Sequence, residues 1–256
     1  MAPDLMETER DAPAAASPTT PSAEVNPLQG TRLYVVPGSN AQKQADTWRQ
    51  SRAADAAQMD RIAAQPQAIW FGDWNPDPFA WVSEVTRRIR TAGSLPVYVL
   101  YNIPKRDCGL YSSGGASGAG AYQRWISEVA RGIGSEPAVV VLEPDAIAGM
   151  DCLSAAEQSD RLAMIVQAVR TLKAAGRITV YIDAGNARWH SPDAIADRLR
   201  ATGIAEADGF ALNISNFLGN DESIRYGDAV SRLVGGKHFI VDTSRNGAGP
   251  TPNFDW

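Results

Sequence analysis

Three aspartates that follow three different apolar runs are the residues of this chain best suited to acid–base chemistry. Asp107, Asp145 and Asp183 come after the segments "VYVLY", "AVVVLE" and "TVYI". When carboxyl groups crowd together in a cleft, their pKa values move apart, so one stays protonated while another stays charged. This division of roles suits acid-catalysed cleavage of a glycosidic bond.

Each aspartate alone also has a structural explanation, because Asp commonly caps a helix or closes a turn. Three of them together, with Tyr101, Trp189 and Asn216 at neighbouring strand ends, favour a shared site. The aromatic residues support a carbohydrate ligand, since the apolar faces of sugar rings stack on Trp and Tyr. Other aromatic residues, such as Trp125, fit a role in the core equally well.

The elements that must position these residues are short β-branched runs that alternate with helical segments. The predicted strands lie at 33–36, 68–71, 97–101, 138–143, 179–182, 209–214 and 238–242. The clearest helix is predicted over 154–176, where apolar residues recur at helical spacing. It opens on Ser154 with Glu157 three residues later and closes at Gly176, which is the pattern of a capped helix.

Strands that are apolar on both faces and separated by helices predict a parallel sheet covered by helices. We therefore expect an α/β fold, a distorted (β/α) TIM-like barrel with about seven parallel strands, whose carboxyl ends share one rim. Residues 1–25 are rich in Ala, Pro, Ser and Thr and are predicted to be a disordered lead or linker. Residues 26–256 are predicted to form one catalytic domain.

Composition argues against several other classes of protein. The formal net charge of -5 and the absence of a Lys/Arg run argue against nucleic-acid binding. No apolar run approaches the roughly 18 residues of a membrane span, so no membrane partner is expected. Only two histidines are present and no serine lies in a G-x-S-x-G motif, so neither a metal or other cofactor nor a serine nucleophile is expected. A barrel enzyme for phosphorylated metabolites would need a phosphate grip near the last strands, and the sequence has none.

The two cysteines, Cys108 and Cys152, flank the segments that carry Asp107 and Asp145. Their spacing fits either a disulfide or two buried thiols. A disulfide would place the protein outside a reducing cytosol.

Five ordered segments of the chain resemble the family 6 glycoside hydrolases, a family of cellulases, and most closely its actinobacterial endoglucanase-like members. The segments are "YNIPKRDCGLYSSGGA", "VVVLEPDAIA", "YIDAGNARWH", "GFALNISNF" and "DTSRNGAGP". The resemblance runs from about residue 33 to residue 256. It implies hydrolysis of internal β-1,4-glucosidic bonds with inversion of configuration, as in an endo-β-1,4-glucanase acting on cellulose or cello-oligosaccharides.

The resemblance also implies roles for the residues in these segments. Asp145 matches the general acid that protonates the leaving oxygen, and Asp107 matches a second acid that tunes this proton and orders water. Tyr101 matches a tyrosine that favours a distorted sugar ring. Inversion requires room for a water, so the two carboxyl groups are expected to be roughly 6.5–9.5 Å apart. The base is either Asp107, reached through water, or a later carboxylate.

Further positions are implied to contact substrate or to hold the site together. Asp183 and Trp189 match substrate-contacting residues, and Ser112 and Ser113 fall in a flexible loop that closes over the sugar. Cys108 and Cys152 match a family disulfide, which implies secretion, although no signal peptide is visible. We expect a monomer whose partner is a β-1,4-glucan.

The chain departs from the family pattern in two places. Asn186 stands where the family usually has His, and Asn keeps hydrogen-bonding ability but carries no proton near neutral pH. The chain also stops after "GPTPNFDW", before the last barrel strand of the family, so we expect a fragment of a longer enzyme.

In family members that work from chain ends, long loops enclose the substrate, whereas members that cut internally have an open cleft. The segment between Asp107 and the helix at Tyr122 is short, so the resemblance implies an open cleft and cleavage within the glucan chain. A cellobiohydrolase, which works from chain ends, is one alternative. A carbohydrate-binding protein without catalysis, or an inactive cellulase fragment, is the other.

Overall fold

The computed structural model describes residues 28–251 and divides the chain into two units, 1–31 and 32–256. Of the first unit only residues 28–31 are described, a turn in which the Thr31 N–H donates to the Leu28 carbonyl. The predicted disordered lead, 1–25, lies outside the described residues. All elements below belong to the second unit.

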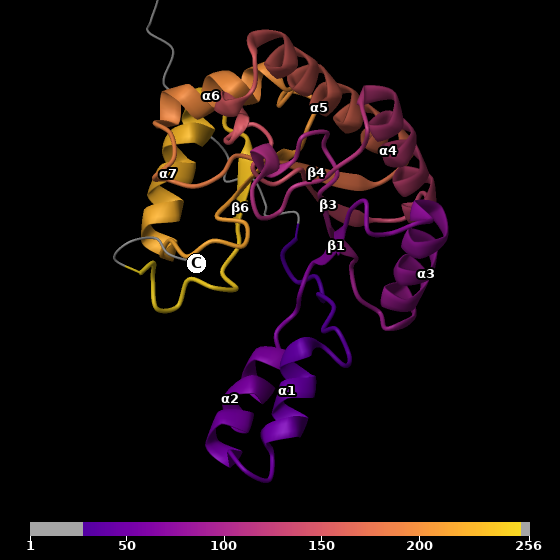
Figure 1. Cartoon of the computed structure of the whole chain (residues 1–256), viewed down its shortest axis with the longest axis vertical. Coiled ribbons are helices and arrows are strands. Elements are labelled where there is room, and N and C mark those ends of the chain that lie inside the picture. Colours follow the sequence, from indigo (N-terminus) through magenta and orange to yellow (C-terminus); the bar gives the residue numbers. More distant parts are fainter. Residues whose placement is uncertain (1–27, 252–256) are drawn as a thin grey trace, which may run out of the picture. The chain divides into compact units, whose positions relative to one another are not determined.

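Six parallel strands form one sheet in which the order in space follows the order along the chain (Figure 1). The strands are β1 (Ile69–Phe71), β2 (Val97–Leu100), β3 (Ala138–Leu142), β4 (Ile178–Asp183), β5 (Gly209–Leu212) and β6 (His238–Val241). β3 is central, with all five of its side chains buried. Such continuous burial is expected for a strand that helices cover on one face and other side chains cover on the opposite face.

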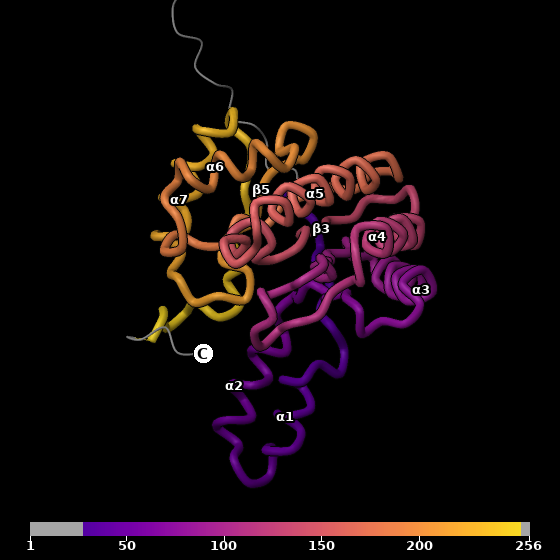
Figure 2. Tube along the Cα trace, turned by 45° about the horizontal axis from the view of Figure 1, so that its top comes forward, coloured from indigo at the N-terminus to yellow at the C-terminus, as the bar shows by residue number. Residues whose placement is uncertain are grey.

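Helices connect successive strands, as parallel pairing requires. They are α3 (Pro78–Thr91), α4 (Ala119–Ile133), α5 (Ala155–Ala175), α6 (Pro192–Ala201) and α7 (Asn220–Leu233). Figure 2 shows α3, α4 and α5 side by side along the outside of the sheet, and α6 packs on α7. Two further helices, α1 (Asn40–Trp48) and α2 (Ala53–Ala63), pack against each other before β1.

The predicted helix over 154–176 is confirmed almost to the residue. Ser154 caps α5 through a capping box, in which the Ser154 N–H donates to the Glu157 carboxylate and the Glu157 N–H donates to the Ser154 hydroxyl. This exchange satisfies two backbone donors that the first turn of a helix leaves free. α5 ends at Gly176, as expected.

The predicted α/β architecture with a parallel sheet is confirmed, but one of the seven predicted strands is wrong. Residues 33–36 contribute only an isolated bridge between Leu33 and Leu95. Leu33 and Val35 are exposed, and the turn at Pro37 and Gly38 ends the extended run. Tyr34 is buried and Val36 packs against the core, so only one face of the run is covered, and the run pairs with the sheet at a single bridge.

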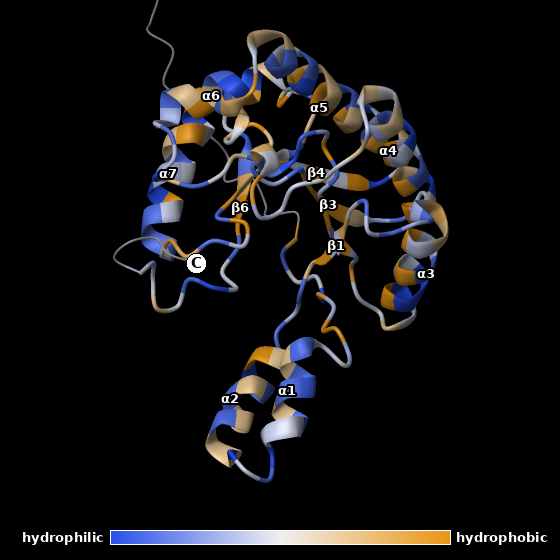
Figure 3. Cartoon of the chain, viewed as in Figure 1, coloured by the Kyte–Doolittle hydropathy of each residue, from blue (hydrophilic) through white to orange (hydrophobic). Residues whose placement is uncertain are grey.

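The core lies between the sheet and the inner faces of α3 to α7. Hydrophobic residues colour much of the strands in Figure 3. Tyr98, Phe71, Tyr122 and Phe210 are among its largest fully buried members. Within residues 28–251, no helix is both long enough and apolar enough to cross a bilayer.

The backbone just after β2 and β3 adopts left-handed conformations at non-glycine residues. Lys105, Asp107 and Cys108 have φ between 51° and 56°, and Glu143 and Asp145 have φ of 52° and 67°. Such conformations cost of order 1–3 kcal/mol each and persist where surrounding contacts enforce them, often at functional sites.

Candidate active site

Arg106 organises the loop that carries Asp107 after β2. Its buried guanidinium donates to the carbonyls of Tyr101 at 2.8 Å, Ser112 at 2.7 Å and Ser113 at 3.1 Å, and to the Asp73 carboxylate at 3.0 Å. Five donors in one plane allow arginine to tie together several acceptors in this way. The loop is therefore folded around one buried cation.

Asp107 lies in a short 3-10 helix, η1 (Asp107–Gly109), and is partly exposed. Its carboxylate accepts the Ser112 backbone N–H at 2.7 Å. Ser112 and Ser113 are exposed. Their predicted closure over a sugar remains a prediction.

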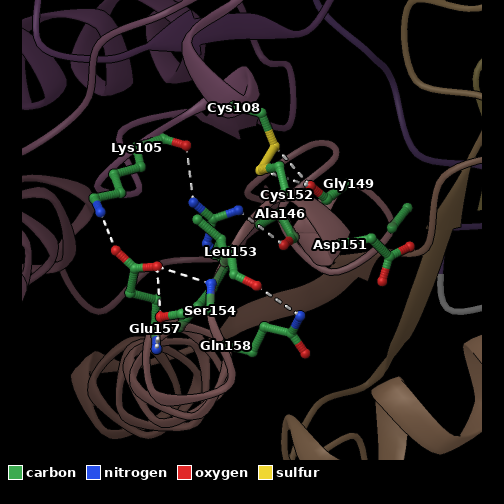
Figure 4. Close-up of a disulfide and its surroundings, with 12 residues drawn as sticks. Lys105, Cys108, Ala146, Gly149, Asp151, Cys152, Leu153, Ser154, Glu157 and Gln158 are labelled. Carbon is green, nitrogen blue, oxygen red and sulfur yellow. Dashed lines mark hydrogen bonds and ion pairs between the residues drawn. A yellow bond between two sulfur atoms is a disulfide. The ribbon is translucent and has the colours of Figure 1, made fainter.

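A disulfide between Cys108 and Cys152 joins the two loops that carry Asp107 and Asp145, and this pairing confirms the prediction (Figure 4). Cys152 lies in a second 3-10 helix, η2 (Met150–Cys152), which follows β3. The two Cα atoms are 6.1 Å apart although the cysteines are separated by 44 positions in sequence.

Asp145 lies just after β3 in a left-handed conformation and is partly buried. Burial, followed by the negative charge of Asp107, raises the pKa of Asp145 to about 6. Both causes disfavour the charged form of the carboxyl group. The structure thus gives Asp145 the property that a general acid near neutral pH requires.

Asp183 ends β4 and supports Asp145 through the backbone. One carboxylate oxygen of Asp183 accepts the N–H groups of Asp145 at 2.9 Å and Gly185 at 3.0 Å. The other oxygen is buried and has no hydrogen-bond partner among the described residues. Burial and the charge of Asp145 raise the pKa of Asp183 well above its usual value.

Tyr101, at the end of β2, lies with the two acids. Burial, followed by the charges of Asp145 and Asp107, raises the pKa of its phenol. Its ring has the Arg106 guanidinium 4.7 Å from its centroid on one side and meets Trp70 edge-on at 5.5 Å. Tyr101, Asp107 and Asp145 therefore form one cluster at the carboxyl ends of β2 and β3.

The remaining predicted site residues differ in their exposure to solvent. Trp189 is 39% exposed, and its ring packs on Gly185, where an added Cβ would lie 2.7 Å from the ring. Asn186 is buried, and its side-chain oxygen accepts the Arg188 N–H. Asn216 is also buried, and its side-chain oxygen accepts the Phe217 N–H. In this structure Asn186, Asn216 and Asp183 contact protein, and their predicted role in substrate binding stays a prediction.

Glu143, which sequence patterns did not single out as a site residue, is fully buried directly before Pro144. Its carboxylate accepts the N–H groups of Asn102 and Ile103 at 2.9 Å and so ties the end of β3 to the end of β2. Burial raises the pKa of Glu143 to about 7, and the two backbone N–H groups oppose this rise. A charged residue inside the otherwise apolar run "VVVLE" was the available signal.

The exposed aromatic residues Trp70 and Trp74, at the end of β1, were also not predicted as part of the site. Trp70 contacts Tyr101, and Trp74 lies with its ring centroid 5.4 Å from the Arg106 guanidinium. Their segment, "IWFGDWNP", has the same strand-to-polar transition that singled out the other loops.

The sequence profile of glycosyl hydrolases family 6 matches residues 28–256. The chain belongs to glycosyl hydrolases family 6. Among its relatives within the family, endoglucanase A of Cellulomonas fimi is 41% identical over 233 residues, which are 90% of this chain and 49% of that protein. Endoglucanase 1 of Streptomyces sp. (strain KSM-9) is 47% identical over 196 residues, which are 75% of this chain and 55% of that protein.

A solved structure of the family has a similar fold. The endoglucanase Cel6 from Mycobacterium tuberculosis, in complex with a thio-cellobioside, is 43% identical and superposes with a TM-score of 0.82. The match covers 89% of this chain and 77% of that one. This likeness supports the predicted distorted barrel. The chain spans about half the length of the two curated endoglucanases.

Proposed function

We propose that this chain is an inverting endo-β-1,4-glucanase, or the part of one that contains the general acid, and that Asp145 is this acid. The observation that carries the proposal is the position of Asp145 at the carboxyl end of β3, where it is partly buried and where partial burial and the charge of Asp107 raise its pKa to about 6. A carboxyl group with this pKa is protonated in mildly acidic solution and is strong enough to protonate a glycosidic oxygen.

Asp107 has a different environment and a different proposed role. It is partly exposed, and its carboxylate accepts the backbone N–H of Ser112. We propose that Asp107 orders the water that attacks the sugar. In an inverting reaction, water attacks the face of the sugar opposite to the acid. The attacking water can lose its proton through a second water to Asp107 or directly to a later carboxylate. We propose the relay to Asp107, because Asp107 lies among the residues that the structure describes.

Tyr101 and Trp189 are proposed to contact the glucan. Tyr101 is close enough to both acids for their charges to raise its pKa, and we propose that it borders the sugar whose bond is cut and favours the distorted ring. Trp189 presents a partly exposed ring on which a neighbouring sugar can stack. We propose that the glucan is also contacted by further polar residues, which are Ser112, Ser113, Asp183, Asn186 and Asn216.

The proposed substrates are cellulose and cello-oligosaccharides. We propose that the protein acts on them outside the cell and as a monomer. The endoglucanase relatives and the thio-cellobioside complex of the M. tuberculosis enzyme support the substrate. The disulfide between Cys108 and Cys152 supports an oxidising compartment.

The test compares the chain with its Asp145→Asn variant on carboxymethyl cellulose, following viscosity and reducing ends together. A rapid fall in viscosity with few reducing ends, seen only when Asp145 is present, is the expected result for an endoglucanase. Reducing ends released without loss of viscosity would instead support a cellobiohydrolase. Binding of cellulose by both proteins without any hydrolysis would support the non-catalytic alternative.

A further inference from the structure

Arg161 lies in the second turn of α5 and is only 2% exposed to solvent, although it carries a charge. Its Nη2 donates to the carbonyls of Pro104 at 2.7 Å and Lys105 at 2.9 Å. Its Nη1 donates to the carbonyl of Ala146 at 3.3 Å. One guanidinium thus reaches two loops that are far apart in sequence.

These two loops are the ones that carry the acids. Lys105 precedes Asp107 by two residues, and Ala146 directly follows Asp145. A guanidinium is planar and rigid, so it fixes the relative positions of the carbonyls that it binds. Arg161 therefore links the backbone next to one carboxyl group to the backbone next to the other.

The burial of Arg161 is not explained by an ion pair. Within the described part of the chain, its three hydrogen bonds all go to backbone carbonyls, and its Nε has no partner. Burial lowers the pKa of Arg161, and the charge of the buried Glu143 opposes this effect. Burying a cation without a carboxylate partner is costly, so a hydrophobic residue would serve packing better.

Other contacts from the same segment hold the Asp107 loop from outside. The Glu157 carboxylate pairs with the Lys105 ammonium, and Cys152 is bonded to Cys108 (Figure 4). Glu157 and Arg161 are one helical turn apart, so they reach Lys105 from the same face of α5. The left-handed conformations of Lys105, Asp107 and Asp145 need such support to persist.

We propose that Arg161 is a positioning residue that sets the separation of the Asp107 and Asp145 carboxyl groups by clamping the loops that carry them. This inference rests on the proposed function, since it assigns Arg161 a role in that reaction. Among the described residues, the titratable groups that interact with Asp145 are Asp107, Asp183 and Tyr101, so Arg161 acts through the backbone of the two loops.

The test replaces Arg161 by Lys, which keeps a charge but loses the planar fork, and by Gln, which keeps one donor group. Arg170→Gln is the matched control, because Arg170 lies on the same helix and its exposed guanidinium pairs with Glu206. For each protein, kcat and KM on cellohexaose, the pH profile of kcat and the melting temperature are measured. The pKa of the Asp145 carboxyl group is measured separately by carbon-13 NMR.

Loss of the clamp should lower kcat roughly 10- to 100-fold, because a misplacement of about 1 Å has effects of this size. KM should change less than threefold, Arg161→Lys should retain more turnover than Arg161→Gln, and Arg170→Gln should match the unaltered chain. As Asp107 moves away, its charge raises the pKa of Asp145 less, so both the alkaline limb and the NMR pKa should move to lower pH.

A lower melting temperature with unchanged kcat and unchanged Asp145 pKa would assign Arg161 to stability alone and overturn the proposal. Failure of both variants to fold at 25 °C would have the same meaning. An unaltered chain that does not hydrolyse cellohexaose would contradict the proposed function, and the NMR pKa would still report whether Arg161 positions the two acids.

Discussion

The Asp183 carboxylate accepts the backbone N–H of Asp145 at 2.9 Å, so the end of β4 holds the backbone of the acid that follows β3. The same oxygen accepts the Gly185 N–H, which leaves two buried donors dependent on one side chain. Asp183 is 1% exposed. Its first role in this structure is therefore to fix the Asp145 backbone in its left-handed conformation.

Replacing Asp183 by Ala should lower both stability and turnover. The two N–H groups would lose their acceptor, and each unsatisfied buried donor costs on the order of 1–3 kcal/mol. Asp183→Asn retains an acceptor oxygen and should lose much less. Urea unfolding of the three proteins measures this difference, and equal stability of the Ala and Asn variants would contradict the assigned hydrogen bonds.

The pH dependence of turnover should have an alkaline limb set by Asp145. A general acid must be protonated, so kcat should fall as pH rises through about 6. In Asp107→Asn the residual activity should show this limb at lower pH, because the charge of Asp107 raises the pKa of Asp145. The limb should stay above the ordinary aspartate pKa of about 3.9, since burial remains.

The control for this shift is Asp228→Asn, which removes one negative charge from the exposed face of α7. Profiles are recorded between pH 4 and pH 8 with cellohexaose at constant ionic strength. A limb that does not move in Asp107→Asn would mean that Asp107 does not interact with the acid.

Stability should also depend on pH through Glu143. Its pKa is raised from 4.5 to about 7 in the fold, so between these values the folded chain binds more protons than the unfolded chain. The free energy of unfolding should therefore decrease as pH rises through this range. Asp145 and Asp183, whose pKa values are also raised, act in the same direction.

Glu143→Gln should flatten this decrease, although it also replaces an acceptor oxygen that the Asn102 and Ile103 N–H groups use. Glu206→Gln is the control. The hydrogen bond from Arg170 lowers the pKa of Glu206, so Glu206 contributes to the pH dependence of stability with the opposite sign to Glu143. Urea unfolding at pH 4.5, 6 and 7.5 gives the free energy of unfolding of each variant and of the unaltered chain as a function of pH. An identical slope in Glu143→Gln and the unaltered chain would show that Glu143 does not titrate in this range.

The parts of the fold that could be predicted from sequence are those set by local signals. Ser154, Glu157 and Gly176 define both ends of α5, and the run of valines in β3 indicates a buried strand. Residues 33–36 are also apolar, but no local signal tells that Leu33 and Val35 stay exposed while Tyr34 is buried. Burial depends on neighbours that the segment itself does not specify.

The same limit applies to the candidate site. Polar residues at strand ends indicated Asp107, Asp145 and Tyr101, because a parallel sheet brings such ends together. The roles of Glu143 and Arg161 depend on backbone contacts 40 and 57 positions away. Single-sequence patterns carry no information on such pairs.

Breaking the disulfide should lower stability and turnover together. Closure of a loop between Cys108 and Cys152, 44 positions apart, contributes about 4 kcal/mol in the chain-entropy treatment. Dithiothreitol should therefore lower the melting temperature and should also loosen the Asp107 loop. The Cys108→Ser, Cys152→Ser double variant should resemble the reduced chain and show no further response to dithiothreitol. A response of the double variant equal to that of the unaltered chain would mean that the reductant acts elsewhere.

Trp189→Ala should weaken binding of cello-oligosaccharides roughly 5- to 30-fold, or about 1–2 kcal/mol, the size typical of an exposed aromatic contact. Trp81→Ala is the matched control, because Trp81 is 49% exposed on α3. Isothermal titration with cellotetraose, in the Asp145→Asn background to prevent turnover, gives both affinities. The ring of Trp189 also packs on Gly185, so its loss affects stability as well. A lower melting temperature with unchanged affinity would therefore assign Trp189 to packing, whereas weaker binding at unchanged stability would place a sugar on its exposed face.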